Sequence, residues 1–599
     1  MERRVLLAFF LSFLVLYAYQ AVFVPSPPES SPAAAPAPGS TALALGGAPA
    51  RDAQTADRTA EPGPPGRSEI ATAPAIAPPI VTADAAREIV VDSPAFSAVF
   101  TNRGAELVSW KLKNYFYEGT DSPIDLIPQE LPEEEPSPFA LVFADTAVTA
   151  HASEALYRAT RDGRPLAEGT GELRLTDRAT TLIFDYEEAG GLRVSKRFHF
   201  DPADPFVVTV TIDATLGGQP QTPVIRWGPA LGGVESSSSG FAYRVGPRGV
   251  LFGGVRQPDG RVEEDVERPD GAASYGGFLQ FVGIDNHYFI AAAMPGDGVE
   301  TAVSYRAVPQ PPLTDGGDVR SLMAFDLAFP DDDITDVPFF LGPKDFEILE
   351  AAHASMVRSI EFGWFGWLVV PLHRSLTWVH DYVGNWGWSI IFLTFLINIV
   401  IFPLKHKSVM SMRKMQEVQP EMKAIQERYK HLKTTDPDKQ KMNQEIMALY
   451  RDRGVNPASG CLPMLLTMPV LFAFYRLLSM SIEIRGEPFV GWITDLAVRD
   501  PLFVLPAFMG ASMVVQQRMT PTQADPMQQK IMMFMPIMFT VMMGFAPAGL
   551  VLYWMTSNVI QIGQQFATNK IIGPPKIRTV RPAAERRVNK TGGPKKASA

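Results

Sequence analysis

The sequence predicts a multi-pass α-helical membrane protein with six spans, a large all-β domain outside the cytoplasm and a cytoplasmic helical hairpin. One apolar run near the N-terminus and five after residue 385 approach the about 20 residues that a helix needs to cross a bilayer. Residues 86–345 instead contain short alternating runs separated by Asp-Pro, Gly-Gly and Asp-Gly turns, which is typical of a β-sandwich. Basic residues are concentrated in a few segments, as in multi-pass membrane proteins.

The N-terminal element is predicted to be an uncleaved signal anchor over residues 1–24. Its apolar part, residues 5–24, carries no charge, follows Arg3 and Arg4, and does not end in a small-residue cleavage site. Residues 25–85 are rich in Pro, Ala, Gly and Ser, so they cannot bury enough apolar area to become ordered. They are predicted to be a flexible linker to the β domain.

The charge distribution predicts which segments face the cytoplasm. The formal net charge is −10, but residues 405–460 hold 12 Lys/Arg against 7 Asp/Glu, and residues 570–599 hold 9 against one. Because basic loops are retained in the cytoplasm, we expect both termini, the loop 405–460 and residues 518–529 to lie there. Residues 482–500 and the β domain are then expected outside.

The sequence does not support disulfide, metal, nucleotide or serine-hydrolase chemistry. The single cysteine, Cys461, excludes an intrachain disulfide and a multi-cysteine metal site. The sequence contains no zinc-protease, P-loop or nucleophile-elbow motif. We therefore expect no enzyme activity, no cofactor and no bound metal.

Residues 346–385 are predicted to include an amphipathic helix at the outer membrane interface. Five of the nine tryptophans lie between residues 363 and 388, interleaved with histidines and charged residues. Tryptophan is enriched where a membrane meets water. An ordinary core helix of a soluble protein is the alternative.

The C-terminal part is predicted to be a core of five spans over residues 386–570. The spans are expected at residues 386–404, 461–481, 501–517, 530–546 and 548–568.

Residues 405–455, between the first two of these spans, are predicted to form an antiparallel helical hairpin. Apolar side chains recur every three or four residues over 405–432, and Asp436-Pro437 is a start signal for a second helix. The basic surface and flexible methionine side chains suit a capture surface for varied apolar partners. Its candidate residues are Met412, Met415, Met422, Lys405 and Lys407.

Four motifs, in order along the chain, resemble those of the YidC membrane protein insertase family. They are Gly384-Asn385-Trp386-Gly387-Trp388-Ser389-Ile390-Ile391, Asn456-Pro457 with Gly460-Cys461, Pro463 and Met468-Pro469, Asp525-Pro526-Met527-Gln528-Gln529-Lys530-Ile531-Met532, and Gly549-Leu550-Val551-Leu552-Tyr553-Trp554 with Ser557-Asn558. The resemblance covers residues 363–570, together with the order of anchor, linker and β domain found in Gram-negative members.

The resemblance implies a protein of the bacterial inner membrane with both termini in the cytoplasm. Such proteins insert newly synthesised inner-membrane proteins and help them to fold, alone or with the Sec translocon, through a hydrophilic groove open to cytoplasm and lipid. Residues 86–345 would be a periplasmic β-supersandwich. The implied partners are nascent membrane proteins, the Sec translocon, membrane lipid and the ribosome. Ribosome contact would use the cytoplasmic loops and the basic tail 571–599, although the tail also fits a topology signal alone.

The candidate groove combines polar side chains within apolar segments with an apolar wall. Polar groups inside a membrane are costly and usually functional. The groove candidates are Thr394, Asn398, Pro463, Met464, Thr467, Met468, Pro469, Tyr553, Trp554 and Asn558.

Asn398 stands where the family usually carries an arginine, and Trp554 where a tyrosine is usual. Asparagine offers two donors and an acceptor but no charge. We therefore expect Asn398 to hydrate the groove with reduced charge selectivity, an interhelical hydrogen bond being the alternative. Arg476 is a candidate compensating charge or an arginine that snorkels to the outer interface, and Lys405 and Lys407 are the other candidates.

Two other functions remain open. Six spans with internal polar residues also fit a membrane channel or transporter, although the hydrophobic segments show no internal repeat. The β domain also fits a membrane-tethered periplasmic protein that binds or acts on carbohydrate, although no spacing of its acidic residues distinguishes a catalytic pair.

Overall fold

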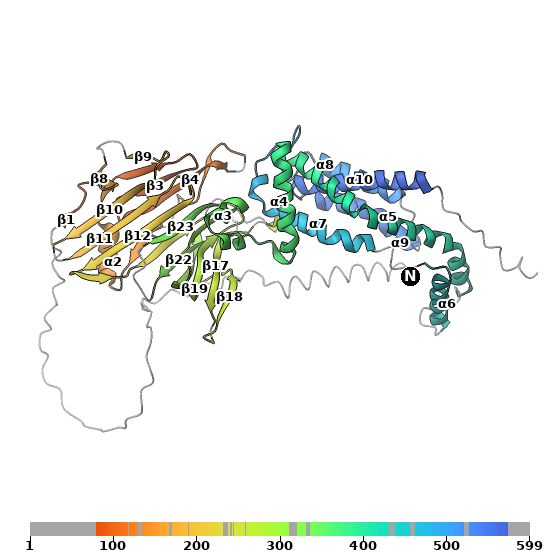
Figure 1. Cartoon of the computed structure of the whole chain (residues 1–599), viewed down its shortest axis with the longest axis horizontal. Coiled ribbons are helices and arrows are strands. Elements are labelled where there is room, and N and C mark those ends of the chain that lie inside the picture. The colour runs from red at the N-terminus through yellow and green to blue at the C-terminus, as the bar shows by residue number, and fades with distance from the viewer. Residues whose placement is uncertain are drawn as a thin grey trace, which may run out of the picture. The chain divides into compact units, whose positions relative to one another are not determined.

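The structure is a computed structural model (Figure 1). It describes residues 79–572, except residues 118, 130–134, 167–170, 190, 232–237, 240–241, 244, 258, 311–319, 331–335, 430–437, 456–461 and 520–525. The predicted N-terminal anchor, nearly all of the linker, the Asp436-Pro437 helix start and the basic tail therefore lie outside the described residues.

Strands dominate residues 79–343. Among the described residues, one 16-stranded sheet has the order β6-β14-β22-β21-β19-β20-β23-β12-β11-β10-β7-β8, with β1, β13, β17 and β18 paired beside this path. Its strands are β1 Pro79–Val81, β6 Ala140–Val142, β7 Arg158–Arg161, β8 Arg164–Pro165, β10 Thr180–Glu188, β11 Leu192–Phe200, β12 Val207–Leu216, β13 Gln219–Gln221, β14 Val224–Ala230, β17 Arg248–Arg256, β18 Val262–Glu267, β19 Ala273–Asp285, β20 Phe289–Ala293, β21 Glu300–Gln310, β22 Arg320–Ala328 and β23 Asp336–Pro343.

A second sheet of five strands has the order β5-β4-β3-β2-β9. Its strands are β2 Glu88–Asp92, β3 Phe96–Thr101, β4 Glu106–Phe116, β5 Pro123–Asp125 and β9 Glu172–Arg174. All of its pairings are antiparallel except that of β2 with β9. A short pair, β15 Ser238–Ser239 and β16 Ala242–Tyr243, and one helix, α2 Thr146–Glu154, complete the elements of this region.

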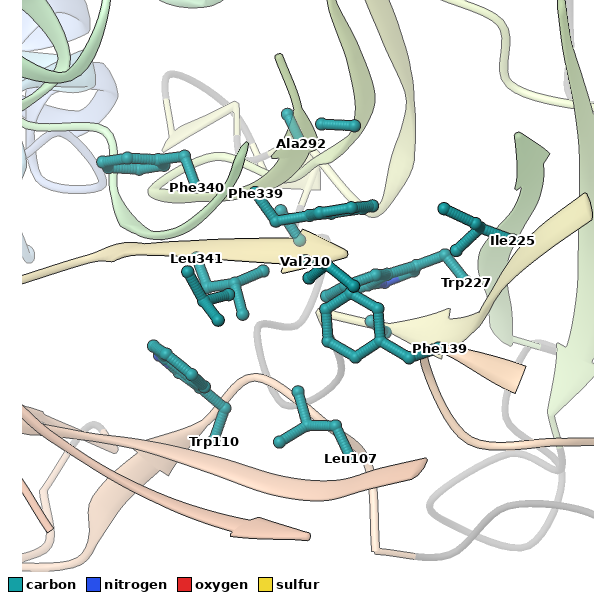
Figure 2. Packing of buried hydrophobic residues seen from close by; sticks show 14 of the residues in the cluster. Leu107, Trp110, Phe139, Val210, Ile225, Trp227, Ala292, Phe339, Phe340 and Leu341 are labelled. Carbon is teal, nitrogen blue, oxygen red and sulfur yellow. The ribbon is translucent and has the colours of Figure 1, made fainter. Parts of the chain in front are cut away.

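The two sheets share one aromatic core. The ring centroids of Phe100 in β3 and Phe198 in β11 lie 4.7 Å apart. Phe139 makes edge contacts with Trp227 at 5.1 Å and with Phe339 at 5.0 Å, and Figure 2 shows Trp110 approaching this cluster from β4. Side chains of β10 and β11 alternate between buried and more exposed positions. The predicted all-β domain is confirmed, and this alternation is the reason that it was visible in the sequence.

Helices follow from residue 346. The first are α3 Phe346–Ala352, the 3₁₀ turns η1 Ala354–Ser359 and η2 Gly363–Phe365, and α4 Gly366–Val383. Helix α4 buries Val369, Leu372, Leu376 and Val379 on one face. Trp364, Trp367 and Trp378 are exposed, up to 89% for Trp364, whereas Trp386 at the start of the next helix is buried. The helix is therefore amphipathic, and its position at a membrane interface remains a prediction.

Helix α5, Trp386–Arg428, continues without a break from the predicted span 386–404 into the predicted hairpin. Pro403 and Pro420 lie within it, although each proline removes one backbone donor from the helix. Within the described residues, α5 alone is long and apolar enough to cross a membrane, and Thr467–Met480 and Met533–Met543 are shorter apolar stretches. The number of spans remains a prediction.

Helix α6, Asp438–Asp452, runs antiparallel to the end of α5. Arg453 pairs with Glu421 at 2.6 Å, and Arg428 with Glu445 at 2.6 Å. Between these ion pairs the Tyr450 hydroxyl donates to the sulfur of Met422 at 3.1 Å. These contacts join α6 to the end of α5, the two helices of the predicted hairpin.

The remaining helices are α7 Leu462–Met480, α8 Val504–Met519, α9 Pro526–Met543 and α10 Ala548–Ile572, with the 3₁₀ turn η4 Ile482–Ile484 after α7. Their apolar core is shared with α5 and includes Ile390 of α5 together with Phe474, Met509 and Val551. Helices α8 and α9 approach closely where Gly510 faces Thr540. This small residue permits the approach, as is common between membrane helices.

Candidate functional site

A line of polar side chains is buried along one face of α5. Thr394 and Asn398 are one turn apart, and 4% of Asn398 is exposed. The Thr394 hydroxyl donates to the Ile390 carbonyl at 2.6 Å, and Asn398 Nδ2 donates to the Thr394 carbonyl at 2.8 Å. These backbone contacts orient the Asn398 side chain and leave its oxygen free to accept from another partner.

Lys405 supplies that partner. Its ammonium donates to Asn398 Oδ1 at 2.8 Å, and the lysine is 9% exposed. Seven residues are about two turns of an α-helix, so the uninterrupted course of α5 places the two side chains on one face. Lys407 is exposed instead. The two lysines that the sequence proposed together therefore have different surroundings.

Arg476 lies beside the segment that leads into α4. A Cβ atom on Gly363 would stand 3.6 Å from Arg476 Nη2. Burial acts to raise the pKa of Glu361, but the hydrogen bond and charge of Arg248 outweigh it and lower the pKa, with smaller contributions from Arg268 and Arg476. The charge of Arg476 thus contributes to lowering the pKa of Glu361. The cation that is hydrogen-bonded to Asn398 is Lys405 instead.

The aromatic candidates on α10 have different environments. Tyr553 is buried and stacks on Phe474 with ring centroids 4.2 Å apart. Trp554 is half-buried and lies 5.4 Å from the Phe539 ring. Tyr553 thus belongs to the packed core of the helices, while Trp554 borders it.

Asn558, a predicted groove residue, begins a ladder of hydrogen-bonded polar side chains whose other members were not predicted from the sequence. Its Nδ2 donates to Ser512 Oγ of α8 at 3.2 Å. One turn further along α10, Gln561 accepts from Gln516 Nε2 at 2.9 Å and donates to Ser557 Oγ at 3.0 Å.

The ladder continues towards the end of α10. Gln565 Nε2 donates to Asn569 Oδ1 at 3.3 Å, and Arg413 Nη2 of α5 donates to the same oxygen at 2.6 Å. The signal in the sequence was the recurrence of polar residues at every fourth position from Ser557 to Asn569. The polar faces of α5, α8 and α10 therefore provide donors and acceptors along an otherwise apolar helical region.

The other predicted residues are placed as follows. Thr467, Met468 and Pro469 lie half-buried on α7, and Met415 and Met422 lie half-buried on α5. The side chains of Met412, Pro463 and Met464 lie outside the described residues. In the part of the chain that the structure describes, no group of three or more His, Cys, Asp and Glu side chains is arranged to hold a metal ion.

Comparison with known proteins gives consistent matches along the chain. The family model described as 60Kd inner membrane protein matches residues 378–574, and that described as YidC periplasmic domain matches residues 88–375. A solved structure described as an active YidC insertase with the first transmembrane domain resolved covers 82% of this chain and 94% of its own chain. It is 17% identical with a TM-score of 0.33, too low to establish a shared fold.

Curated relatives match over nearly the whole length. The membrane protein insertase YidC of Geobacter metallireducens is 34% identical over 582 residues, which cover 96% of this chain and 99% of the relative. The protein of the same name from Syntrophus aciditrophicus is 33% identical and covers 95% of this chain and 100% of its own. The chain therefore belongs to the YidC family of membrane protein insertases.

Proposed function

We propose that this protein inserts newly synthesised proteins into the bacterial inner membrane and helps them to fold, alone or with the Sec translocon. The proposal rests on relatives named membrane protein insertase, which are 34% and 33% identical to this chain over nearly its whole length. The buried pair of Asn398 and Lys405, on the described helix that is long and apolar enough to span, is consistent with it.

The proposed mechanism uses the polar faces of α5, α8 and α10 as the wall of a hydrated groove. An unsatisfied polar group in hydrocarbon costs several kcal/mol. A peptide tail that exchanges hydrogen bonds with Asn558, Gln561 and Gln565 avoids part of that cost. The groove shortens the apolar path that the tail must cross.

Release into lipid would follow from apolar surface on α5 and α9. Phe395, Ile399 and Val400 of α5 are exposed, as are Phe534, Ile537 and Val541 of α9. A hydrophobic segment that slides along these residues into the bilayer gains about 25 cal/mol for each Å² of apolar surface removed from water. This gain, rather than nucleotide hydrolysis, would drive insertion.

The remaining parts are assigned by charge and amphipathicity. We place the β domain and α4 on the periplasmic side, with the exposed tryptophans at the membrane interface. The α5–α6 hairpin and the basic tail are placed in the cytoplasm, where they would capture nascent chains and contact ribosomal RNA.

Insertion by the full-length protein in liposomes tests the function. The substrate is a small membrane protein with a short translocated tail, and the measurement is the fraction of tails protected from added protease. We expect a larger protected fraction than in empty liposomes, and a several-fold loss for Gln561→Leu with Gln565→Leu. The control Val559→Leu changes an exposed side chain of the same helix. Equal protection in empty liposomes rejects the function, and ion flux without protection favours a channel.

A further inference from the structure

Two carboxylates and two cations form a network of ion pairs beside η1. Asp285 is fully buried, and it pairs with Arg248 at 3.2 Å and with Lys344 at 2.7 Å. Arg248 also pairs with Glu361 at 3.0 Å. The charges within this network balance one another, so a further cation near it is in excess.

Arg268 and Arg476 are two such cations. Arg268 Nη2 donates to the backbone carbonyls of Arg358 and Ser359 at 3.1 and 3.2 Å, and its buried Nε has no hydrogen-bond partner among the described residues. Burial lowers the pKa of Arg268, and the charge of Arg248 acts in the same direction, against two nearby carboxylates. In the part of the chain that the structure describes, neither Arg268 nor Arg476 forms an ion pair, although both act on the carboxylate of the network that follows η1. The cluster therefore has an excess of positive charge.

Arg476 also borders an exposed aromatic surface. Phe472, one turn earlier on α7, is 43% exposed and stacks on Phe365 with ring centroids 5.7 Å apart. Trp364 lies beside Phe365 and is 89% exposed. The preceding residue, Gly363, closely approaches the Arg476 guanidinium. A cation next to exposed aromatic rings provides contacts for both parts of an amphiphile, its charged headgroup and its apolar chains.

We propose that Arg476 binds the phosphate of an acidic phospholipid in the outer leaflet, and that the charge of Arg268 adds to the attraction. A guanidinium group donates two parallel hydrogen bonds to one phosphate. The acyl chains cover Phe472 and Phe365, a contact that a free phosphate ion does not make. The net negative charge of the lipid offsets the positive excess of the cluster, whereas a zwitterionic headgroup does not. The choice of leaflet follows from the proposed periplasmic position of α4.

Native mass spectrometry of the full-length protein in detergent measures this binding. The protein is titrated with phosphatidylglycerol and, separately, with phosphatidylcholine, and the dissociation constant of the first bound lipid is determined. Phosphatidylglycerol is expected to bind about tenfold more tightly. Arg476→Gln is expected to weaken its binding about tenfold, which corresponds to loss of one hydrogen bond to a charged group. Unchanged binding of phosphatidylcholine shows that the variant remains folded.

Two further variants separate the site from general charge effects. Arg374→Gln removes an arginine of α4 whose charge is paired with Glu350 at 3.2 Å, and it is expected to change neither dissociation constant. Arg476→Lys keeps the charge without the planar fork, so it is expected to retain part of the affinity that Arg476→Gln loses.

A competition experiment distinguishes lipid from free phosphate. Inorganic phosphate at the concentration of the lipid is expected to displace none of it, because the ion makes no contact with the aromatic rings. Displacement under this condition, equal affinity for the two lipids, or equal losses with Arg374→Gln and Arg476→Gln overturns the proposal. Since no inserted protein takes part in these measurements, their outcome is independent of the insertion activity.

Discussion

Asp345 forms the N-cap of α3 in an environment that opposes its ionisation. Its Oδ1 accepts from the backbone N–H groups of Glu347 and Ile348 at 2.9 and 3.0 Å. Burial, followed by the nearby charge of Glu483, raises the pKa of Asp345 from 3.8 to about 6, although these two hydrogen bonds act in the opposite direction. The folded protein therefore holds this proton more tightly than the unfolded chain does.

The consequence is a loss of stability as the pH rises. Protonation of Asp345 favours the folded state fully below pH 3.8, and the contribution is lost as the pH rises through about 6. In Asp345→Asn the cap oxygen is retained without a titrating group. The free energy of unfolding of the wild type relative to this variant is expected to fall by about 2 kcal/mol over that interval. Urea unfolding of the full chain in detergent at pH 4 and pH 7 measures the difference. An unchanged difference contradicts the account.

At the scale of single residues, the sequence identified Asn398 as unusual but did not identify Lys405 as its hydrogen-bond partner. Asn398 was recognisable because it interrupts an apolar run. The choice between Lys405 and Lys407 depended on whether α5 continues through Pro403. In a continuous helix, a residue seven positions on returns to the same face, whereas one nine positions on lies about half a turn away. A predicted boundary at residue 404 concealed this geometry.

The contact between α8 and α9 depends on the absence of a side chain. A Cβ atom on Gly510 would lie 2.0 Å from Thr540 Oγ1 and 3.2 Å from Thr540 Cβ. Gly510→Ala is therefore expected to force the helices apart and to destabilise the protein by about 1–3 kcal/mol. Thermal unfolding in detergent, followed by tryptophan fluorescence, measures this change.

Gly563 is the matched control on α10. A Cβ atom there meets nothing within 4 Å among the described residues. Gly563→Ala is expected to be neutral or slightly stabilising, because alanine has the higher helix propensity. Adding Thr540→Ala to Gly510→Ala removes the oxygen at the closest approach and is expected to recover part of the loss. Equal effects of the two glycine substitutions show that the contact does not limit stability.

At the scale of elements, the periodicity of apolar residues was sufficient to predict strands. It did not predict the polar contacts between the helices. The alternation in β10 and β11 has the period of a strand with one buried face. The polar ladder of α10 was hidden because its residues are few among many apolar ones and acquire meaning only from their partners on α8 and α5. Such partners come from distant parts of the chain, and a single sequence does not specify them.

At the scale of the whole molecule, the acidic and basic segments predict the orientation in the membrane. The basic loop 405–460 contains α6, whereas residues 482–500 follow α7 and carry little net charge. The positive-inside rule therefore predicts that α6 lies in the cytoplasm and that residues 482–500 lie in the periplasm. Hydropathy alone does not settle this topology, because α5 is the one described helix that meets the length and hydropathy of a span.

Thiol labelling tests this orientation directly. Because Cys461 is the single cysteine, Cys461→Ser gives a background without thiols. Val490→Cys and Met447→Cys each place one thiol at an exposed position, after α7 and on α6 respectively. A membrane-impermeant maleimide added to spheroplasts is expected to label position 490 at once and position 447 only after permeabilisation. Labelling of position 447 in intact spheroplasts reverses the assignment of the hairpin. A hairpin on the periplasmic side cannot meet a chain that leaves the ribosome in the cytoplasm. The proposed capture step would therefore fail as well.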